Sequence, residues 1–184
     1  NPTIAKSDTI QGGVDAALSG DELNIVAGTF DEGPTITIDK DLTISGAGMG
    51  STTMRPTGDT GTSGDARAWW LVNDGVILDL TDLTLDGNGY KVYQGIRNKG
   101  SGSVANVAFN DIKYNESGPD YSGVAIAAFG DGPVDVADCN FTGIGRVGVL
   151  YFGTGVAGST YSGNTYTGKG TGDIRFAGVA EFLD

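Results

Sequence analysis

The sequence contains no histidine and only one cysteine, Cys139. Without histidine the chain lacks the commonest general base and the imidazole ligand of many metal sites, and Ser-His-Asp and Cys-His catalytic arrangements are excluded. A single cysteine excludes a disulfide within the chain and a zinc site built from a cysteine cluster. We therefore expect Cys139 to fill a small buried apolar position.

Long apolar runs and basic stretches are also missing. No run reaches the roughly 18 apolar residues that a membrane-spanning helix needs, so we expect no membrane span. Lysine and arginine number 11 against 23 aspartate and glutamate residues, which gives a formal net charge of −12. Nucleic acid is therefore not an expected partner. The acidity favours solubility, cation binding, or salty or extracellular surroundings.

Proline is scarce and glycine is abundant, with 5 and 32 residues among 184. There is no Gly-X-Y period, which excludes a collagen-like chain. This composition is typical of many short strands joined by tight turns. The length suits one domain with a hydrophobic core, and we expect a single domain over residues 1–184.

Glycine-terminated segments recur along the chain. Each has alternating apolar residues, then Asp or Asn, then an apolar–polar–apolar triplet and glycine. The segments read TITIDKDLTISG, VILDLTDLTLDG, VAFNDIKYNESG, VDVADCNFTGIG and TYSGNTYTGKG. Asp and Asn tolerate left-handed backbone and bond their own backbone at turns, so we predict a structural corner ladder here. Its members are Asp41, Asp82, Asp111, Asn140 and Asn164.

A second type of strand lies between these segments, as WWLVNDG, GIRNKG, GVAIAAFGDG, GVLYFGTG and GDIRFAGVAEF. Each repeat then holds three short strands, which is the size of one coil of a β-solenoid. A single coil cannot bury its apolar side chains, but stacked coils can. Alternation predicts one inward-facing set. Its members are Ile36, Ile38, Leu42, Ile44, Leu78, Leu80, Leu83, Leu85, Val107, Phe109, Ile112, Tyr114, Val134, Val136 and Phe141.

The segments NFTGIG, NTYTGKG and DLTLDGNG resemble the Asn-x-apolar corner of right-handed parallel β-helix repeat proteins. The start of the chain is similar to the cap helix of that family, with Ile10, Val14, Ala17 and Leu18 on one face. The resemblance implies an all-β, right-handed parallel β-helix of about six coils. It places an N-terminal cap over residues 1–22 and stacked coils over 23–184. The family includes pectin-cleaving enzymes, phage tailspikes, surface-layer proteins and adhesins, so it indicates fold better than function.

The enzymes of that family offer catalytic templates. A pectate-lyase-like site needs calcium-binding acids near a catalytic arginine, and no local spacing links such residues here. The available acids are Asp111, Asp135 and Asp138, and the arginines are Arg97, Arg146 and Arg175. The histidine of a polygalacturonase site and the pectin-esterase motifs are missing. We therefore lean towards a non-catalytic protein, in which these arginines form surface salt bridges.

We expect no cofactor, with calcium as the alternative. Hard cations take several oxygen ligands, and stacked acids would repel one another without a cation between them. Asp82 and Asp111 are the candidate ligands.

A polar, glycine-rich insertion covers about residues 49–68 and leads into Trp69 and Trp70. Loops on a rigid scaffold often carry function. Adjacent residues of a strand point to opposite faces, so we expect one tryptophan inside and one outside. The outer one is a candidate contact with a glycan or with another subunit; the alternative is that the insertion folds over it.

Two N-glycosylation sequons are present, at Asn115 and Asn140, and Asn115 is the better candidate because Asn140 is assigned to a corner. The sequence begins with Asn-Pro rather than methionine. From this we expect removal of a signal peptide and an extracellular or cell-surface location.

Two classes of function remain. The first is a non-catalytic extracellular structural protein, a self-assembling cell-surface, sheath or filament subunit. Its partners would be copies of itself, forming a homo-oligomer or filament by pairing at exposed β-helix ends. The alternative is a polysaccharide-binding or polysaccharide-cleaving, pectate-lyase-like β-helix protein.

Overall fold

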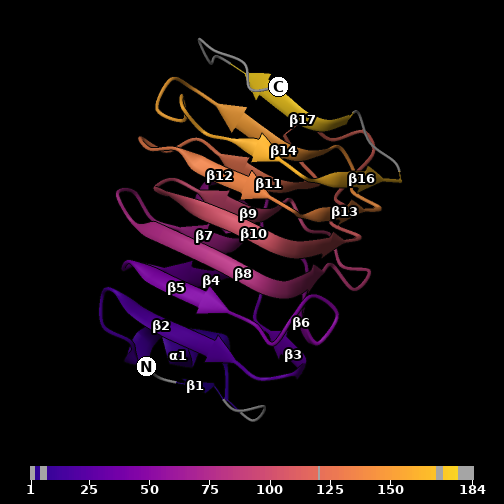
Figure 1. Cartoon of the computed structure of the whole chain (residues 1–184). Helices are drawn as coiled ribbons and strands as arrows, with labels where there is room; N and C mark the ends of the chain where they lie inside the picture. The colour runs from indigo at the N-terminus through magenta and orange to yellow at the C-terminus, as the bar shows by residue number, and fades with distance from the viewer. Residues whose placement is uncertain (1–2, 5–7, 120, 169–171, 178–184) are drawn as a thin grey trace.

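The computed structural model describes residues 3–4, 8–119, 121–168 and 172–177. The chain rises through stacked coils, with the helix α1 at one end and strand β17 at the other (Figure 1). The first coil consists of β2 (Asp21–Ile25), β3 (Gly28–Glu32) and β4 (Ile36–Ile38), and the second of β5 (Leu42–Ser45), β6 (Thr52–Pro56) and β7 (Ala68–Val72). The third consists of β8 (Ile77–Asp86) and β9 (Gln94–Asn98), and the fourth of β10 (Ser101–Asn110) and β11 (Val124–Ala128). The fifth consists of β12 (Val134–Ala137), β13 (Asn140–Thr142) and β14 (Val147–Phe152), and the sixth of β15 (Tyr161–Ser162), β16 (Thr165–Thr167) and β17 (Gly172–Ala177).

All strand pairs between coils are parallel, as in the register of β8 with β10 and of β7 with β9. Within the described residues sheet A has 11 strands, and β3, β6, β13 and β16 join it beside the second halves of β8 and β10. In the same part of the chain sheet B has six strands in the order β17-β14-β11-β9-β7-β4, one for each coil. In Figure 1 the near strands run from left to right and the chain returns across the far side as it rises, which is a right-handed path. The predicted parallel β-helix is confirmed.

The predicted inward-facing residues form the core. All of them are buried except Tyr114, which is only half-buried. Side chains of the same type stack from one coil to the next, as where Leu42 lies beside Leu78 in the ladder. The rings of Phe109 and Phe141 stack with centroids 5.1 Å apart. Cys139 is also buried, as predicted, and burial raises the pKa of its thiol to about 11.

The end of the core beside β2 is covered by helix α1 (Ile10–Ala16) and carries the short strand β1 (Thr3–Ile4). Ile10 and Val14 are buried against the core. The Glu32 side chain accepts a hydrogen bond from the Ile10 amide at 2.7 Å, and its burial raises the pKa of its carboxyl. Leu18, predicted to share the buried face, is 74% exposed because the helix ends before it. No helix in the described part of the chain is long and apolar enough to span a membrane.

The predicted corner ladder is wrong, because its five members occupy different places in their coils. Asp41 precedes β5, whereas Asp82 lies in the middle of β8 and Asp111 follows β10. Asn140 is the first residue of β13 and pairs with Ala108. Asn164 lies just before β16, beside Cys139. The repeated segments were matched to one another by residue type and by the nearby glycine. That match does not reveal that two different corners use Asp or Asn.

Left-handed backbone defines the two real corners. The first column holds Asp82, Asn106 and Asp138, with φ values of 60°, 53° and 53°, and Gly163 with φ 67°. A second column follows the next strand segment, with Asp111, Gly143 and Gly168 at φ 52°, 65° and 114°. Only Gly, and less often Asn or Asp, adopts this conformation readily, which explains the residue types in both columns.

Other Asp and Asn side chains link one coil to the next through backbone amides. Asp41 Oδ1 accepts a hydrogen bond from the Ile77 amide at 2.9 Å, and Asp135 Oδ1 accepts one from the Thr160 amide at 2.8 Å. Asn164 Oδ1 accepts from the Cys139 amide at 2.8 Å. These side chains satisfy backbone donors at the ends of strands.

Replacing Asp138 tests the corner assignment. Asp138→Ala places a Cβ-bearing residue without a turn-forming side chain at φ 53°, so we expect a loss of about 1 kcal/mol in the free energy of unfolding. Asp138→Gly fits the same backbone and is expected to stay within a few tenths of a kcal/mol of the parent. Urea unfolding of the three proteins measures both values. Equal losses for Ala and Gly would contradict a backbone role.

Candidate functional site

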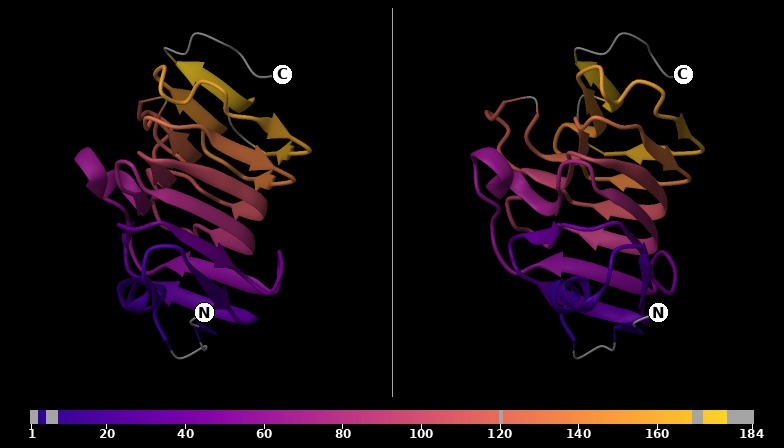
Figure 2. Two further views of the ribbon diagram at one scale, coloured as in Figure 1. Left: turned by 60° about the vertical axis from the view of Figure 1, so that its left-hand side comes forward. Right: turned by 90° about the vertical axis from the view of Figure 1, so that its left-hand side faces the viewer.

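The predicted insertion is shorter than expected, because residues 52–56 form strand β6. The remaining segment, residues 57–67, ends in a short 3-10 helix, η1 (Gly64–Arg67), and is called the strap here. Figure 2 shows η1 on the outside of the stack of coils. Near its start the strap is bound to the third coil, where the Thr60 amide donates to the Lys91 carbonyl oxygen at 3.0 Å and the Lys91 amide donates to Asp59 at 2.8 Å.

Trp69 and Trp70 both lie in the main core and are fully buried, so the predicted outward tryptophan is wrong. Strict alternation fails at this point of sheet B. In β11 the neighbours Ala125 and Ile126 likewise both belong to the core. Neither tryptophan is accessible to a glycan or to another subunit.

A groove of about 220 Å³ lies on the outer face of sheet B, and we call it the Arg97 groove. Ala127 and Leu150, at neighbouring positions of β11 and β14, belong to a small apolar cluster outside the main core. Aromatic and cationic side chains surround them. The lining includes Arg67, Gln94, Arg97, Tyr121, Phe129 and Phe152.

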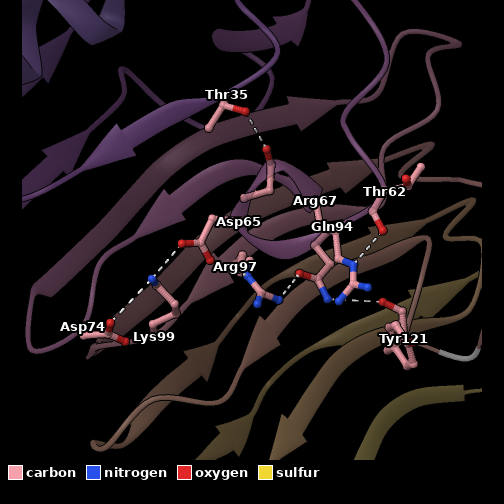
Figure 3. A network of polar contacts seen from close by, with 10 residues as sticks. Thr35, Thr62, Asp65, Arg67, Asp74, Gln94, Arg97, Lys99 and Tyr121 are labelled. Atoms are coloured by element: carbon pink, nitrogen blue, oxygen red, sulfur yellow. Dashed lines mark hydrogen bonds and ion pairs between the residues drawn. The ribbon is translucent and has the colours of Figure 1, made fainter.

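Arg97 is the central cation of the groove. Its guanidinium lies over the Phe129 ring, 4.1 Å from the centroid, and donates to Gln94 Oε1 at 2.9 Å. Its Nε donates to Asp65 Oδ1 at 3.2 Å, and the other carboxylate oxygen of Asp65 accepts from Lys99 at 2.9 Å (Figure 3). Arg97 therefore has a defined orientation, set by an amide, an aromatic ring and a carboxylate of the strap.

Arg67 is placed by the strap and by aromatic rings. Its guanidinium carbon lies 5.1 Å from the Tyr93 ring centroid and 5.4 Å from that of Tyr121. Its Nε donates to the Thr62 carbonyl oxygen at 3.0 Å. Gln94 donates to the Tyr121 carbonyl oxygen at 3.3 Å, which ties the loop before β11 to β9.

Burial and the Asp65 carboxylate have opposite effects on the pKa of Arg97. Partial burial lowers this pKa and is the larger effect, whereas Asp65 raises it. The pKa of Asp65 is lowered, and the hydrogen bond from Lys99 is the largest cause. Arg97 and Lys99 thus share one strap carboxylate, on a chain whose formal net charge is −12.

The lyase template is not assembled in the described part of the chain. Asp135 lies in β12 of sheet A and Asp138 at the corner that follows it, whereas Arg97 lies in sheet B. Arg146 donates to the carbonyl oxygens of Glu116 and Gly118. Arg175 lies in β17 beside Leu150 in register, and its side chain is outside the described residues.

The candidate calcium ligands are not brought together. Asp82 accepts hydrogen bonds from Asn106 and Thr81, at the first corner. Asp111 is paired with Lys113 at the second corner. No group of three or more Asp, Glu, Cys or His side chains suited to a metal ion occurs among the described residues. Calcium binding stays a prediction without structural support.

Sequence reasoning missed most of the groove. It named Arg97, but as part of a lyase template, and it did not single out Asp65, Gln94 or Tyr121. The sequence could have indicated that Phe129 and Phe152 lie together, because each ends a segment of the second type just before a glycine. Aligning GVAIAAF with GVLYF places both rings at the same position of neighbouring coils.

The two sequons differ in their surroundings. Asn115 is exposed on the loop before β11, and its Oδ1 accepts hydrogen bonds from the Ser117 amide and hydroxyl at 3.1 and 3.0 Å. Asn140 lies within β13, which is paired on both sides, and its Oδ1 accepts from Thr165 at 2.5 Å. Asn140 is exposed as well, so its place in the strand ladder and its hydrogen bond with Thr165 are what make Asn115 the more accessible acceptor.

We expect the protein secreted from a eukaryotic host to carry its N-glycan on Asn115 and none on Asn140. Mass spectrometry of glycopeptides measures the occupancy of both sites, and Asn115→Gln is the control that should abolish the modification. A folded product glycosylated mainly at Asn140 would contradict this assignment.

No protein-family model matches the sequence, and no curated protein matches it. Among solved structures, two crystal structures of the pectin methylesterase from Aspergillus niger are similar. One, in penultimately deglycosylated form, has a TM-score of 0.42 and 15% sequence identity, covering 97% of this chain and 84% of the enzyme. The other, in deglycosylated form, has a TM-score of 0.42 and 14% identity, covering 99% and 88%. At this TM-score the likeness says nothing about activity.

Proposed function

We propose that the chain is an extracellular polysaccharide-binding protein that holds a glycan strand in the Arg97 groove. The observation that carries the proposal is the lining of this groove, where aromatic rings and guanidinium groups surround an apolar floor. Sugar rings have apolar C–H faces that pack on aromatic side chains and hydroxyl groups that accept hydrogen bonds from Arg and Gln. Ligand sites commonly combine an apolar lining with a few placed polar groups in this way.

The rigidity of the groove supports the same function. Phe129 and Phe152 are carried by neighbouring coils at one register position, and Arg97 is oriented by Gln94 and the Phe129 ring. A site held in its binding geometry before the ligand arrives loses less conformational entropy on binding. The strongly negative net charge makes nucleic acid an unfavourable ligand for the surface as a whole.

Phe152 gives the sharpest test of glycan binding, because its side chain is 56% exposed and its loss disturbs the core little. We expect Phe152→Ala to weaken binding of a polysaccharide by roughly fivefold to tenfold, the value of one lost ring contact. Isothermal titration calorimetry against a panel of neutral and acidic polysaccharides measures the change.

The matched control is Ile77→Ala, which removes an apolar side chain 46% exposed at the start of β8, in sheet A. It should leave the affinity unchanged. If the parent binds no member of the panel, or if both variants weaken binding equally, the proposal fails.

The second candidate function is a self-assembling structural subunit of a cell surface, sheath or filament. The observation that favours it is the continuous parallel ladder, in which β17 is the last strand of sheet B within the described residues. A neighbouring copy could continue such a ladder by strand addition. Against it, helix α1 covers the other end of the core.

Assembly predicts particles that grow with protein concentration in the absence of any glycan. Static light scattering with negative-stain imaging of the purified chain measures this directly. We expect tubes, fibres or sheets if this second function holds. A monomer whose mass does not change with concentration would leave glycan binding as the sole proposal.

A further inference from the structure

The Asp65 carboxylate is the strap's ionic contact with sheet B. One oxygen lies 3.2 Å from Arg97 Nε and the other 2.9 Å from Lys99 Nζ. The two cationic side chains are only 13% and 16% exposed, whereas that of Asp65 is 48% exposed. Two partly buried cations of β9 and the residue after it thus share one anion, which reaches them from the solvent side.

Apart from Asp65, the outer half of the strap is held mainly through Arg67, whose guanidinium contacts the Tyr93 and Tyr121 rings and whose Nε donates to the Thr62 carbonyl oxygen. Residues 62–66 are all exposed, and η1 contains no buried side chain. The Gly61 amide donates to the Ala66 carbonyl oxygen at 2.7 Å, a contact inside the strap itself. Segments with few buried apolar contacts open locally at low free energy. Asp65 is therefore the ionic contact that, together with the Arg67 contacts, holds residues 61–66 in the closed position.

Arg97 and Lys99 together form an anion site, which could accept another anion in place of the Asp65 carboxylate. Partly buried cations without a counter-ion are unfavourable, so release of Asp65 is easiest when another anion replaces it. A guanidinium and an ammonium group together match a carboxylate or sulfate group. The lowered pKa of Asp65 agrees with strong contacts to both cations.

We propose that Asp65 is an internal stand-in for an anionic group of the ligand, which displaces it from Arg97 and Lys99 and releases the strap. The inference rests on the proposed glycan function and adds a ligand class: a saccharide that carries carboxylate or sulfate groups. A neutral glycan meets the closed strap, whereas an anionic one competes with Asp65 for the two cations. The strap thereby acts as an autoinhibitory contact and as a selector for charge.

Asp65→Asn tests the stand-in, and Asp74→Asn is its matched control. Asp74 also contacts Lys99, at 3.5 Å, but it lies outside the strap and is 82% exposed. We expect faster hydrogen exchange across residues 61–66 in Asp65→Asn and unchanged exchange in Asp74→Asn. With inorganic sulfate as the probe, Asp65→Asn should bind about fivefold more tightly than the parent, because no internal anion competes.

A second arm uses an oligosaccharide of uronic acid units and the same oligosaccharide with its carboxylates esterified. The acidic form should accelerate strap exchange in the parent and gain affinity in Asp65→Asn, whereas the ester should do neither. Unchanged exchange together with unchanged sulfate affinity in Asp65→Asn would overturn the proposal. If neither oligosaccharide binds the parent but the sulfate and exchange results hold, glycan binding fails and the Asp65 contact stands.

Discussion

The parallel backbone ladder between coils is the constraint on which the rest of this structure depends. The strands pair with those of the neighbouring coils, so each coil must return to the same register whatever its length. Chain added to one coil can therefore only bulge outward between strands. The strap does so between β6 and β7, and the loop before β11 does so two coils later. Both leave the ladder intact.

The ladder also explains how so acidic a chain folds without large clusters of like charge in its core. Many Asp and Asn residues have a backbone task, either as left-handed corners such as Asp138 or as acceptors for amides at strand ends such as Asp41. In the second task the carboxylate accepts a hydrogen bond from a donor that would otherwise be unpaired. Part of the acidity of the sequence is accounted for by turns and coil contacts.

The fold could be predicted from sequence because alternation and glycine spacing are local signals. Ile36, Ile38, Leu42 and Ile44 were assigned inward and are buried. Corner columns could not be predicted as well, because two different corners of the later coils accept Asp, Asn or Gly and only the hydrogen-bond register separates them. The prediction of one inward and one outward tryptophan was wrong for a related reason, because the alternation of side chains breaks at one position of sheet B. The groove depends on contacts such as Asp65 with Arg97, 32 residues apart, which no local pattern encodes.

The position of the groove follows from where the coils are free to vary. The strap and the loop before β11 each lead directly into a strand of sheet B, so both lie near the outer face of that sheet. The first supplies Asp65 and Arg67 and the second supplies Tyr121, while β9 supplies Arg97 and the residue after β11 is Phe129. Sheet B thus offers a rigid floor with side chains at fixed coil spacing, and the two loops can change without disturbing it. In such a fold, a loop residue such as Asp65 is best suited to select ligands by their charge, because the positions of the strand residues are already fixed by pairing between coils.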